Sequence, residues 1–213
     1  MPQLRAINFP NGELSLEGLL HLPEQTPAPG IVVCHPHPMY GGDMHNNVVD
    51  AISQTAVENG IVALRFNFRG AGDSEGSYDN GIGERDDIQA ALTYLRGLPE
   101  IDSGRVALAG YSFGAAVALH ATDERLNAFI AVSLPTAMAL NDVHVACPAL
   151  FISGDQDEYS DPGELTRLVH RLGSQAELKL LPGLGHFWFG VEGDLQAIIA
   201  PFLRAHLIGV VSA

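Results

Sequence analysis

Basic residues are scarce in this chain. Its 213 residues include 11 Lys and Arg against 25 Asp and Glu, which gives a formal net charge of −14 at pH 7. A surface this acidic repels phosphate backbones and anionic lipid headgroups. We therefore expect neither a nucleic acid nor a membrane as a partner, and we attribute the acidity to solubility.

Long apolar runs and cysteines are also scarce. No stretch reaches the roughly 18 apolar residues of a membrane-spanning helix, and the opening segment MPQLRAINFPNGELSLEG contains no apolar core of signal-peptide length. Cys34 and Cys147 lie far apart and suit buried thiols better than a disulfide. These features favour a cytoplasmic location. A Cys34 nucleophile paired with His35 is disfavoured, because adjacent strand residues face opposite ways.

The chain instead shows a steady alternation of strand-like and helix-like segments. Short apolar runs rich in β-branched residues predict strands at 30–35, 61–68, 105–110, 128–134, 148–154 and 176–181. Helix-length segments lie at 46–60, 83–98, 112–122, 161–173 and 194–207. Continuously apolar internal strands indicate a parallel sheet that helices cover on both faces.

The N-terminal region has a different pattern. Segments 3–9 and 13–22 alternate apolar and polar residues around Pro10-Asn11-Gly12, which predicts an antiparallel hairpin at the sheet edge. We expect one α/β domain over residues 1–213, with a doubly wound, mostly parallel sheet of about eight strands. In such a sheet ligands bind beyond the carboxyl ends of the strands.

Two segments match Gly-x-Ser-x-Gly, the pattern of a serine on a sharp strand-to-helix turn: GDSEG at 72–76 and GYSFG at 110–114. Ser112 directly follows a predicted strand and opens a helix of small residues, so its hydroxyl can be exposed at the helix N-terminus. Ser74 lies in a glycine-rich loop beside Asp73 and Glu75, whose charges oppose a developing oxyanion. The pattern favours Ser112 as the nucleophile over a simple helix cap.

A base and an acid follow in the order serine, acid, histidine, which is the order of α/β-hydrolases. Asp155 and Asp157 come after the strand at 148–154, and His186 comes after the strand at 176–181. His170 and His206 fall inside predicted helices and are weaker candidates for the base. The residues alone leave the choice between Asp155 and Asp157 open.

With these residues assembled, the sequence resembles a lidless α/β-hydrolase, similar to small bacterial dienelactone-hydrolase-like proteins with an HPHP-x-x-GG stretch. The resemblance covers nearly the whole chain, through HPHPMYGG (35–42), RFNFRGAGDSEG (65–76), GYSFG, GDQD (154–157) and GLGHF (183–187). It implies Ser112 as nucleophile, His186 as base and Asp157 as acid, with Asp155 as the alternative. No cofactor is implied.

The resemblance also implies two oxyanion donors. One is the N–H of Phe113, and the other lies in the loop after His35. Since proline has no N–H, Pro36 and Pro38 are excluded and the second donor is His37 or Met39. We expect the His35 and His37 side chains to shape that loop.

A metal cluster of His35, His37, Asp43 and His45 is an alternative, because some metallo-hydrolases use H-x-H after a strand. The five residues between His37 and Asp43 do not match the H-x-H-x-D-H spacing of metallo-β-lactamases. We therefore expect no metal.

The expected reaction is hydrolysis of a carboxylic ester of a small or compact soluble substrate through an acyl-enzyme. Only residues 135–147 separate two predicted strands where many relatives insert a lid, so a lid domain does not fit. Thioesterase, lactonase or peptidase activity on the same triad, or a non-catalytic binding protein, are the alternatives. Apolar or aromatic residues are expected to line the site: Tyr40, Phe113, Met138, Tyr159, Phe187 and Trp188.

Overall fold

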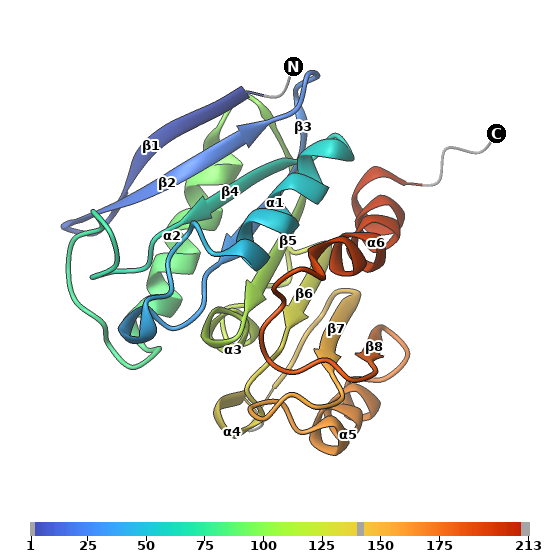
Figure 1. Cartoon of the computed structure of the whole chain (residues 1–213). Helices are drawn as coiled ribbons and strands as arrows, with labels where there is room; N and C mark the ends of the chain where they lie inside the picture. The colour runs from blue at the N-terminus through green and yellow to red at the C-terminus, as the bar shows by residue number, and fades with distance from the viewer. Residues whose placement is uncertain (1–2, 140–142, 210–213) are drawn as a thin grey trace.

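An eight-stranded sheet forms the centre of the protein in the computed structural model, which describes residues 3–139 and 143–209 (Figure 1). The strand order is β1-β2-β4-β3-β5-β6-β7-β8. β1 and β2 pair antiparallel, β2 pairs antiparallel with β4, and the remaining neighbours are parallel. The strands are β1 Gln3–Asn11, β2 Leu14–Leu22, β3 Ala28–Cys34, β4 Val62–Phe66, β5 Ile101–Tyr111, β6 Ala128–Val132, β7 Ala149–Gly154 and β8 Ala176–Leu181.

Burial along the strands follows their place in the sheet. Every residue of β3, β4, β6 and β7 is buried, as helices on both faces require. The N-terminal hairpin strand β2 alternates between half-buried and buried positions, and the edge strand β8 is only partly covered. The doubly wound, mostly parallel sheet and the antiparallel hairpin predicted from the sequence are confirmed.

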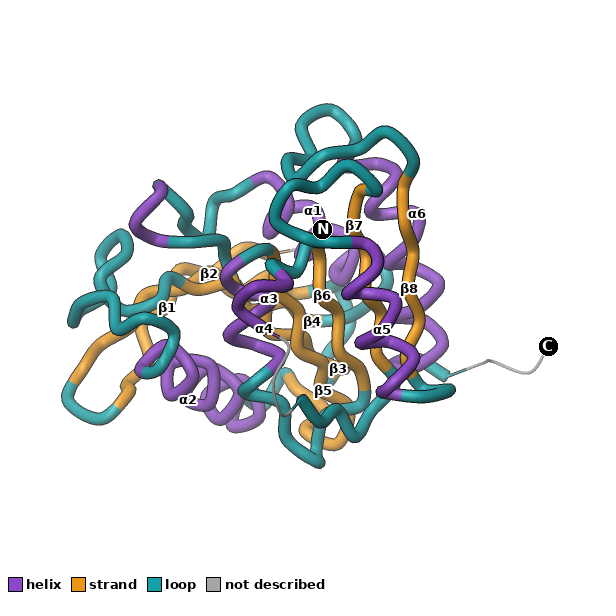
Figure 2. The backbone as a smooth tube through the Cα atoms, turned by 90° about the horizontal axis from the view of Figure 1, so that it is seen from below, coloured by secondary structure: helices purple, strands orange, loops and turns teal. Residues whose placement is uncertain are grey.

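Helices cover the two faces of the sheet and enclose two apolar cores (Figures 1 and 2). One core contains side chains of α2, α3 and α5, and the other contains side chains of α1 and α6. The helices are α1 Asn47–Glu58, α2 Gly83–Gly97, α3 Phe113–Leu119, α4 Thr136–Ala139, α5 Pro162–Leu172 and α6 Glu192–Leu203. A π-helical turn, Arg204–Ile208, continues α6.

Local sequence explains where several helices begin. The Asn46 side chain accepts from the N–H of Val48 to cap α1, and Asp161 accepts from the N–H of Glu164 to cap α5. Pro162 occupies the first position of α5, where its fixed φ suits a helix start.

Two short elements were not expected from the sequence. A 3-10 turn, Pro38–Tyr40, follows β3, and the four-residue α4 lies between β6 and β7. α4 occupies the place where a lid would be inserted, and four residues are too few for a lid domain. No helix within the described ranges is long and apolar enough to cross a bilayer.

Candidate active site

Ser112 lies at the turn between β5 and α3 in a strained backbone conformation, with φ 53° and ψ −121°. Few non-glycine residues adopt such a positive φ, and those that do concentrate at functional sites. Surrounding hydrogen bonds hold the turn: the Ser112 N–H donates to the carbonyl of Val132 at 2.9 Å, and its own carbonyl accepts from Ala115 and Ala116. The turn therefore fixes Ser112 at the carboxyl edge of the sheet.

The glycines that flank Ser112 are required by close backbone contacts. A Cβ on Gly110 would lie 2.4 Å from the carbonyl oxygen of Gly114, and a Cβ on Gly114 would lie 2.4 Å from that of His35. Neither gap can hold a carbon atom. The first turn of α3 therefore packs directly on the chain that leaves β3.

His186 connects Ser112 to Asp157. The ring atom Nε2 lies 2.9 Å from Ser112 Oγ, and Nδ1 lies 2.8 Å and 3.0 Å from the two carboxylate oxygens of Asp157. Since a carboxylate only accepts, Nδ1 carries the proton and Nε2 is left to accept from the serine hydroxyl. His186 and Asp157 are buried. The structure thus brings the three expected residues together from loops after three different strands.

The Asp157 carboxylate is held by several donors. Its Oδ1 accepts from the N–H groups of Tyr159 at 3.0 Å and Ser160 at 3.1 Å, and the Ser153 hydroxyl lies 3.3 Å from Oδ2. Burial alone would raise the pKa of Asp157, but the hydrogen bond and charge of His186, with the N–H of Tyr159 and the Ser133 hydroxyl, outweigh burial and lower it. Asp157 is therefore ionised at neutral pH.

Asp155, the alternative acid, has a different environment. Its side chain is exposed, and Oδ1 accepts from the N–H of Gly183 at 2.7 Å. This bond ties the loop after β7 to the loop after β8. The imidazole of His186 is paired with Asp157 instead.

The other nucleophile candidates, Ser74 and Cys34, are buried in the fold. Ser74 is buried; its hydroxyl accepts from the N–H of Glu17 and donates to the carbonyl of Asn67. Cys34 is fully buried, and burial raises the pKa of its thiol well above the usual value. Of the weaker base candidates, His170 is exposed on α5 and His206 packs against Phe202.

Both ring nitrogens of His35 are used within the fold. Nδ1 donates to the carbonyl of Pro36 at 2.6 Å, and Nε2 accepts from the N–H of Phe68 at 3.0 Å. Burial, only partly offset by the bond to Pro36, lowers the pKa of His35 to about 4. A neutral His35 therefore joins the loop after β3 to the loop after β4.

The HPHP segment also positions backbone N–H groups. His37 Nδ1 accepts from the N–H of Met39 at 3.2 Å, so the amide of Met39 is already used. Among the described residues, neither the N–H of His37 nor that of Phe113 has an acceptor in the protein. The rings of these two residues lie 4.7 Å apart, which places their backbones on neighbouring loops. Of the two expected candidates, His37 and not Met39 has a free amide.

The residues of the alternative metal cluster make other contacts. His37 Nε2 lies 3.2 Å from the Tyr78 hydroxyl, and Asp43 accepts from the N–H of His45. Within residues 3–139 and 143–209, no group of three or more His, Cys, Asp and Glu side chains is arranged to hold a metal ion.

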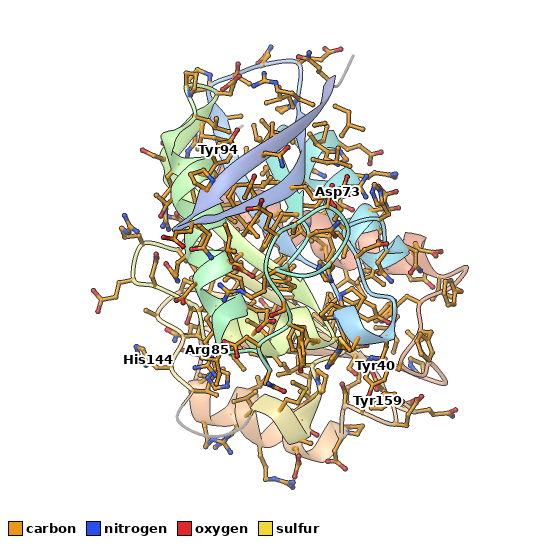
Figure 3. The ribbon with its side chains drawn as sticks, turned by 90° about the vertical axis from the view of Figure 1, so that its left-hand side faces the viewer. Tyr40, Asp73, Arg85, Tyr94, His144 and Tyr159 are labelled. Atoms are coloured by element: carbon orange, nitrogen blue, oxygen red, sulfur yellow. The ribbon has the colours of Figure 1, made fainter. Side chains whose placement is uncertain are left out.

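The expected lining residues divide into exposed and buried ones. Tyr40 is 88% exposed and Met138 is 46% exposed. Figure 3 shows Tyr40 and Tyr159 at the same edge of the molecule. Trp188 is 1% exposed, and its Nε1 donates to the Ser133 hydroxyl at 3.1 Å. The expectation that Trp188 binds substrate is wrong, because the side chain packs in the core with α6.

Sequence reasoning missed two residues that support His186 and Asp157. The Tyr111 hydroxyl donates to the carbonyl of His186 at 3.0 Å, and its ring stacks on the imidazole. Ser133 follows β6 with φ 47°, and its hydroxyl helps to lower the pKa of Asp157. Its position at the carboxyl end of a strand was the available signal for Ser133.

A groove of about 450 Å³ lies apart from this site, between the N-terminal hairpin and α2, lined by Pro10, Asn11, Asp86 and Tyr94 among others. It contains none of the residues that surround Ser112. This groove is therefore not part of the candidate active site.

Comparisons with known proteins identify α/β hydrolases as relatives of this chain. XC6422 from Xanthomonas campestris, described as an α/β serine hydrolase without a lid, is 33% identical with a TM-score of 0.86 over 96% of this chain and 95% of that chain. An α/β serine hydrolase homologue from Coxiella burnetii is 32% identical, with a TM-score of 0.83 over 93% and 97%. Protein RP471 from Rickettsia prowazekii is 36% identical over 88% of this chain and 82% of its own length.

The family assignment rests on most of the sequence. The profile of the Dienelactone hydrolase family matches residues 16–196, a range that includes Ser112, Asp157 and His186. The resemblance to a lidless, dienelactone-hydrolase-like α/β-hydrolase is confirmed, and the chain belongs to the dienelactone hydrolase family.

Proposed function

We propose that this protein is a serine hydrolase that cleaves carboxylic esters of small or compact substrates through an acyl-enzyme. The observation that carries the proposal is the continuous hydrogen-bond chain from Ser112 Oγ through His186 to Asp157. A serine hydroxyl is a weak nucleophile until a base removes its proton, and an imidazole needs an orienting acid to present the right tautomer.

In the proposed reaction, Ser112 Oγ attacks the acyl carbonyl while His186 Nε2 takes the hydroxyl proton. Asp157 stabilises the imidazolium that forms. His186 then gives the proton to the leaving oxygen, which departs as the alcohol. Water, deprotonated by His186, releases the acyl group and restores Ser112.

The negative oxygen of the tetrahedral intermediate needs donors. We assign this role to the N–H groups of Phe113 and His37, which have no acceptor among the described residues. Losing one such donor typically costs about 3 kcal/mol of transition-state stabilisation. Met39 and His37 Nδ1 instead stabilise the turn that presents the His37 amide.

The surroundings of the site favour compact substrates with apolar groups, and thioesters, lactones and peptides are the alternatives on the same triad. Apolar or aromatic residues are among the exposed side chains expected to line the site, including Tyr40, Met138 and Tyr159. The formal charge of −14 disfavours polyanionic thioesters. The reaction uses only protein side chains and water, so we expect no cofactor.

Incubation with a fluorophosphonate, followed by mass spectrometry, tests the proposal. We expect one adduct at Ser112 and turnover of short-chain esters that a chelator does not change. The absence of both an adduct and ester turnover would favour a binding protein that has kept the fold. Loss of turnover with the chelator would point to a metal.

A further inference from the structure

Three exposed aromatic side chains gather beside His186. The Tyr159 ring meets the imidazole edge-on at 4.7 Å, and the Phe187 ring does so at 5.5 Å. Phe189 lies parallel to Phe187 at 6.3 Å. The three residues are 55%, 59% and 75% exposed respectively. We call Tyr159, Phe187 and Phe189 the aromatic shelf.

The backbone explains how the shelf is presented. Along residues 186–189 buried and exposed side chains alternate, so that His186 and Trp188 face inward while Phe187 and Phe189 face outward. Trp188 anchors this segment through its bond to Ser133. Tyr159 is fixed by its main chain, which donates to Asp157 and accepts from Thr136. The shelf therefore rests on anchored segments, although its side chains are exposed.

Exposed apolar residues scattered singly need no explanation, but a contiguous group points to a binding role. This group also borders the base of the proposed reaction. His186 Nε2 must pass its proton to the leaving oxygen, and proton transfer requires the two atoms to be about 3 Å apart. The substituent on that oxygen consequently extends over the side chains that border His186.

We propose that the aromatic shelf binds the alcohol part of the ester, and that it selects neutral alcohols carrying an aromatic or bulky apolar group. This inference rests on the proposed function. The carbonyl oxygen faces the amides of His37 and Phe113, so the alcohol part is the one that lies on the His186 side.

The charges near the shelf support the selection of neutral groups. Glu158 is exposed and precedes Tyr159, and its Oε2 would lie 3.8 Å from a Cβ on Gly185, the residue before His186. Asp155 is exposed on the same loop. A negatively charged alcohol would be repelled by both carboxylates.

The test compares three esters that differ in whether they carry a phenyl ring and on which side of the ester bond they carry it. Ethyl acetate has no aromatic group, 2-phenylethyl acetate carries a phenyl ring on the alcohol side, and ethyl 3-phenylpropanoate carries it on the acyl side. We expect the wild-type kcat/KM for 2-phenylethyl acetate to exceed that for ethyl acetate by about 3- to 10-fold, the range expected for aromatic contacts. A carboxylate on the phenyl ring should remove this advantage.

The double variant Phe187→Ala/Phe189→Ala then isolates the shelf. We expect its ratio of kcat/KM for 2-phenylethyl acetate over ethyl acetate to fall toward 1, with a smaller change in the ratio for ethyl 3-phenylpropanoate. Leu4→Ala is the matched control, because Leu4 is an exposed apolar residue on β1, far along the sheet. It should leave every ratio unchanged.

An unchanged ratio in the double variant, an equal fall for both phenyl esters, or no wild-type preference would overturn the shelf proposal. In each of these cases a fluorophosphonate adduct on Ser112 and turnover of ethyl acetate leave the proposed function standing. If Ser112 takes no adduct and no ester is hydrolysed, the proposed function fails and the shelf proposal fails with it.

Discussion

Ser112 Oγ lies 2.9 Å from His186 Nε2, although 74 residues separate the two in sequence. One residue follows β5 and the other follows β8, and β6 and β7 lie between these strands in the sheet. The loops must therefore reach across the carboxyl edge to meet.

Replacing Ser112 with alanine should lower kcat/KM for an ester by about 10³-fold or more, because the nucleophile is lost. The measurement is initial rates with a short-chain ester, with circular dichroism to check the fold. Ser74→Ala is the matched control from the second Gly-x-Ser-x-Gly segment. It removes a buried hydrogen-bonded hydroxyl and should cost about 1–2 kcal/mol of unfolding free energy while sparing most of the turnover. If Ser74→Ala abolished turnover and Ser112→Ala did not, Ser74 would be the nucleophile.

The two aspartates after β7 give a second prediction. Asp157→Asn should lower kcat by about 10³- to 10⁴-fold, because a neutral amide does not stabilise the imidazolium and its NH2 can donate to Nδ1, which favours the wrong tautomer of His186. Asp155→Asn should change kcat little, since Asp155 contacts Gly183. Steady-state kinetics on both variants show which aspartate acts as the acid. A larger fall in kcat in Asp155→Asn would assign this role to Asp155.

Much of the fold could be predicted from the sequence because its signals are local. Largely apolar runs with β-branched residues identified β3 to β7, and alternation around Gly12 identified the hairpin. Gly110 and Gly114 indicated a tight turn at Ser112. The structure gives the physical reason, because a Cβ at either position would collide with a backbone carbonyl oxygen. The positions of the serine, acid and histidine directly after predicted strands placed the three residues on loops at one edge of the sheet.

The details that the sequence could not provide depend on contacts between distant segments. An aromatic residue close to His186 in the sequence can face either way, and only the packing against α6 and the hydrogen bond to Ser133 place Trp188 inside. The choice between His37 and Met39 as the second proposed oxyanion donor depends on a hydrogen bond that the sequence does not reveal. The His37 ring accepts from the N–H of Met39, which occupies that amide. The order β2-β4-β3 likewise follows from pairing between strands that are not consecutive.

Gly114→Ala should damage the site through backbone contacts. The new Cβ would come within 2.5 Å of two carbonyl oxygens, those of Cys34 and His35, and neither belongs to a flexible side chain. We expect a fall in the melting temperature and a loss of fluorophosphonate labelling at Ser112. Gly97→Ala is the control, because a Cβ at Gly97 meets nothing within 4 Å and alanine favours a helix. Normal labelling in Gly114→Ala would show that the turn tolerates a side chain.

Trp188→Phe should reduce stability without changing substrate binding. The phenyl ring keeps most of the apolar contact but loses the bond from Nε1 to the Ser133 hydroxyl, which should cost about 1–2 kcal/mol of unfolding free energy. KM for ethyl acetate should stay within about twofold of the wild-type value, because Trp188 is buried. Urea unfolding and steady-state kinetics measure the two effects. A large rise in KM at unchanged stability would instead mean that Trp188 contributes to substrate binding.

Acidification should destabilise the protein through His35. Its pKa is about 4 in the folded state because of burial, against 6.5 for an ordinary histidine. Between these values the unfolded chain binds a proton that the folded protein does not, so stability falls as the pH drops below about 6.5. Burial also lowers the pKa of His21 to about 4, which acts in the same direction.

Lowering the pH from about 7 to about 5.5 should cost about 1 kcal/mol of unfolding free energy through His35 alone. Glutamine at position 35 can still accept from the N–H of Phe68 but cannot titrate. His35→Gln should therefore be less stable at pH 7 and show a shallower loss of stability toward pH 5.5. His144→Gln, at an exposed histidine, is the control and should keep the wild-type slope. The readout is the slope of stability against pH, so a general loss of stability in the variant cannot produce the expected change. An unchanged slope in His35→Gln would mean that His35 does not titrate as its burial requires.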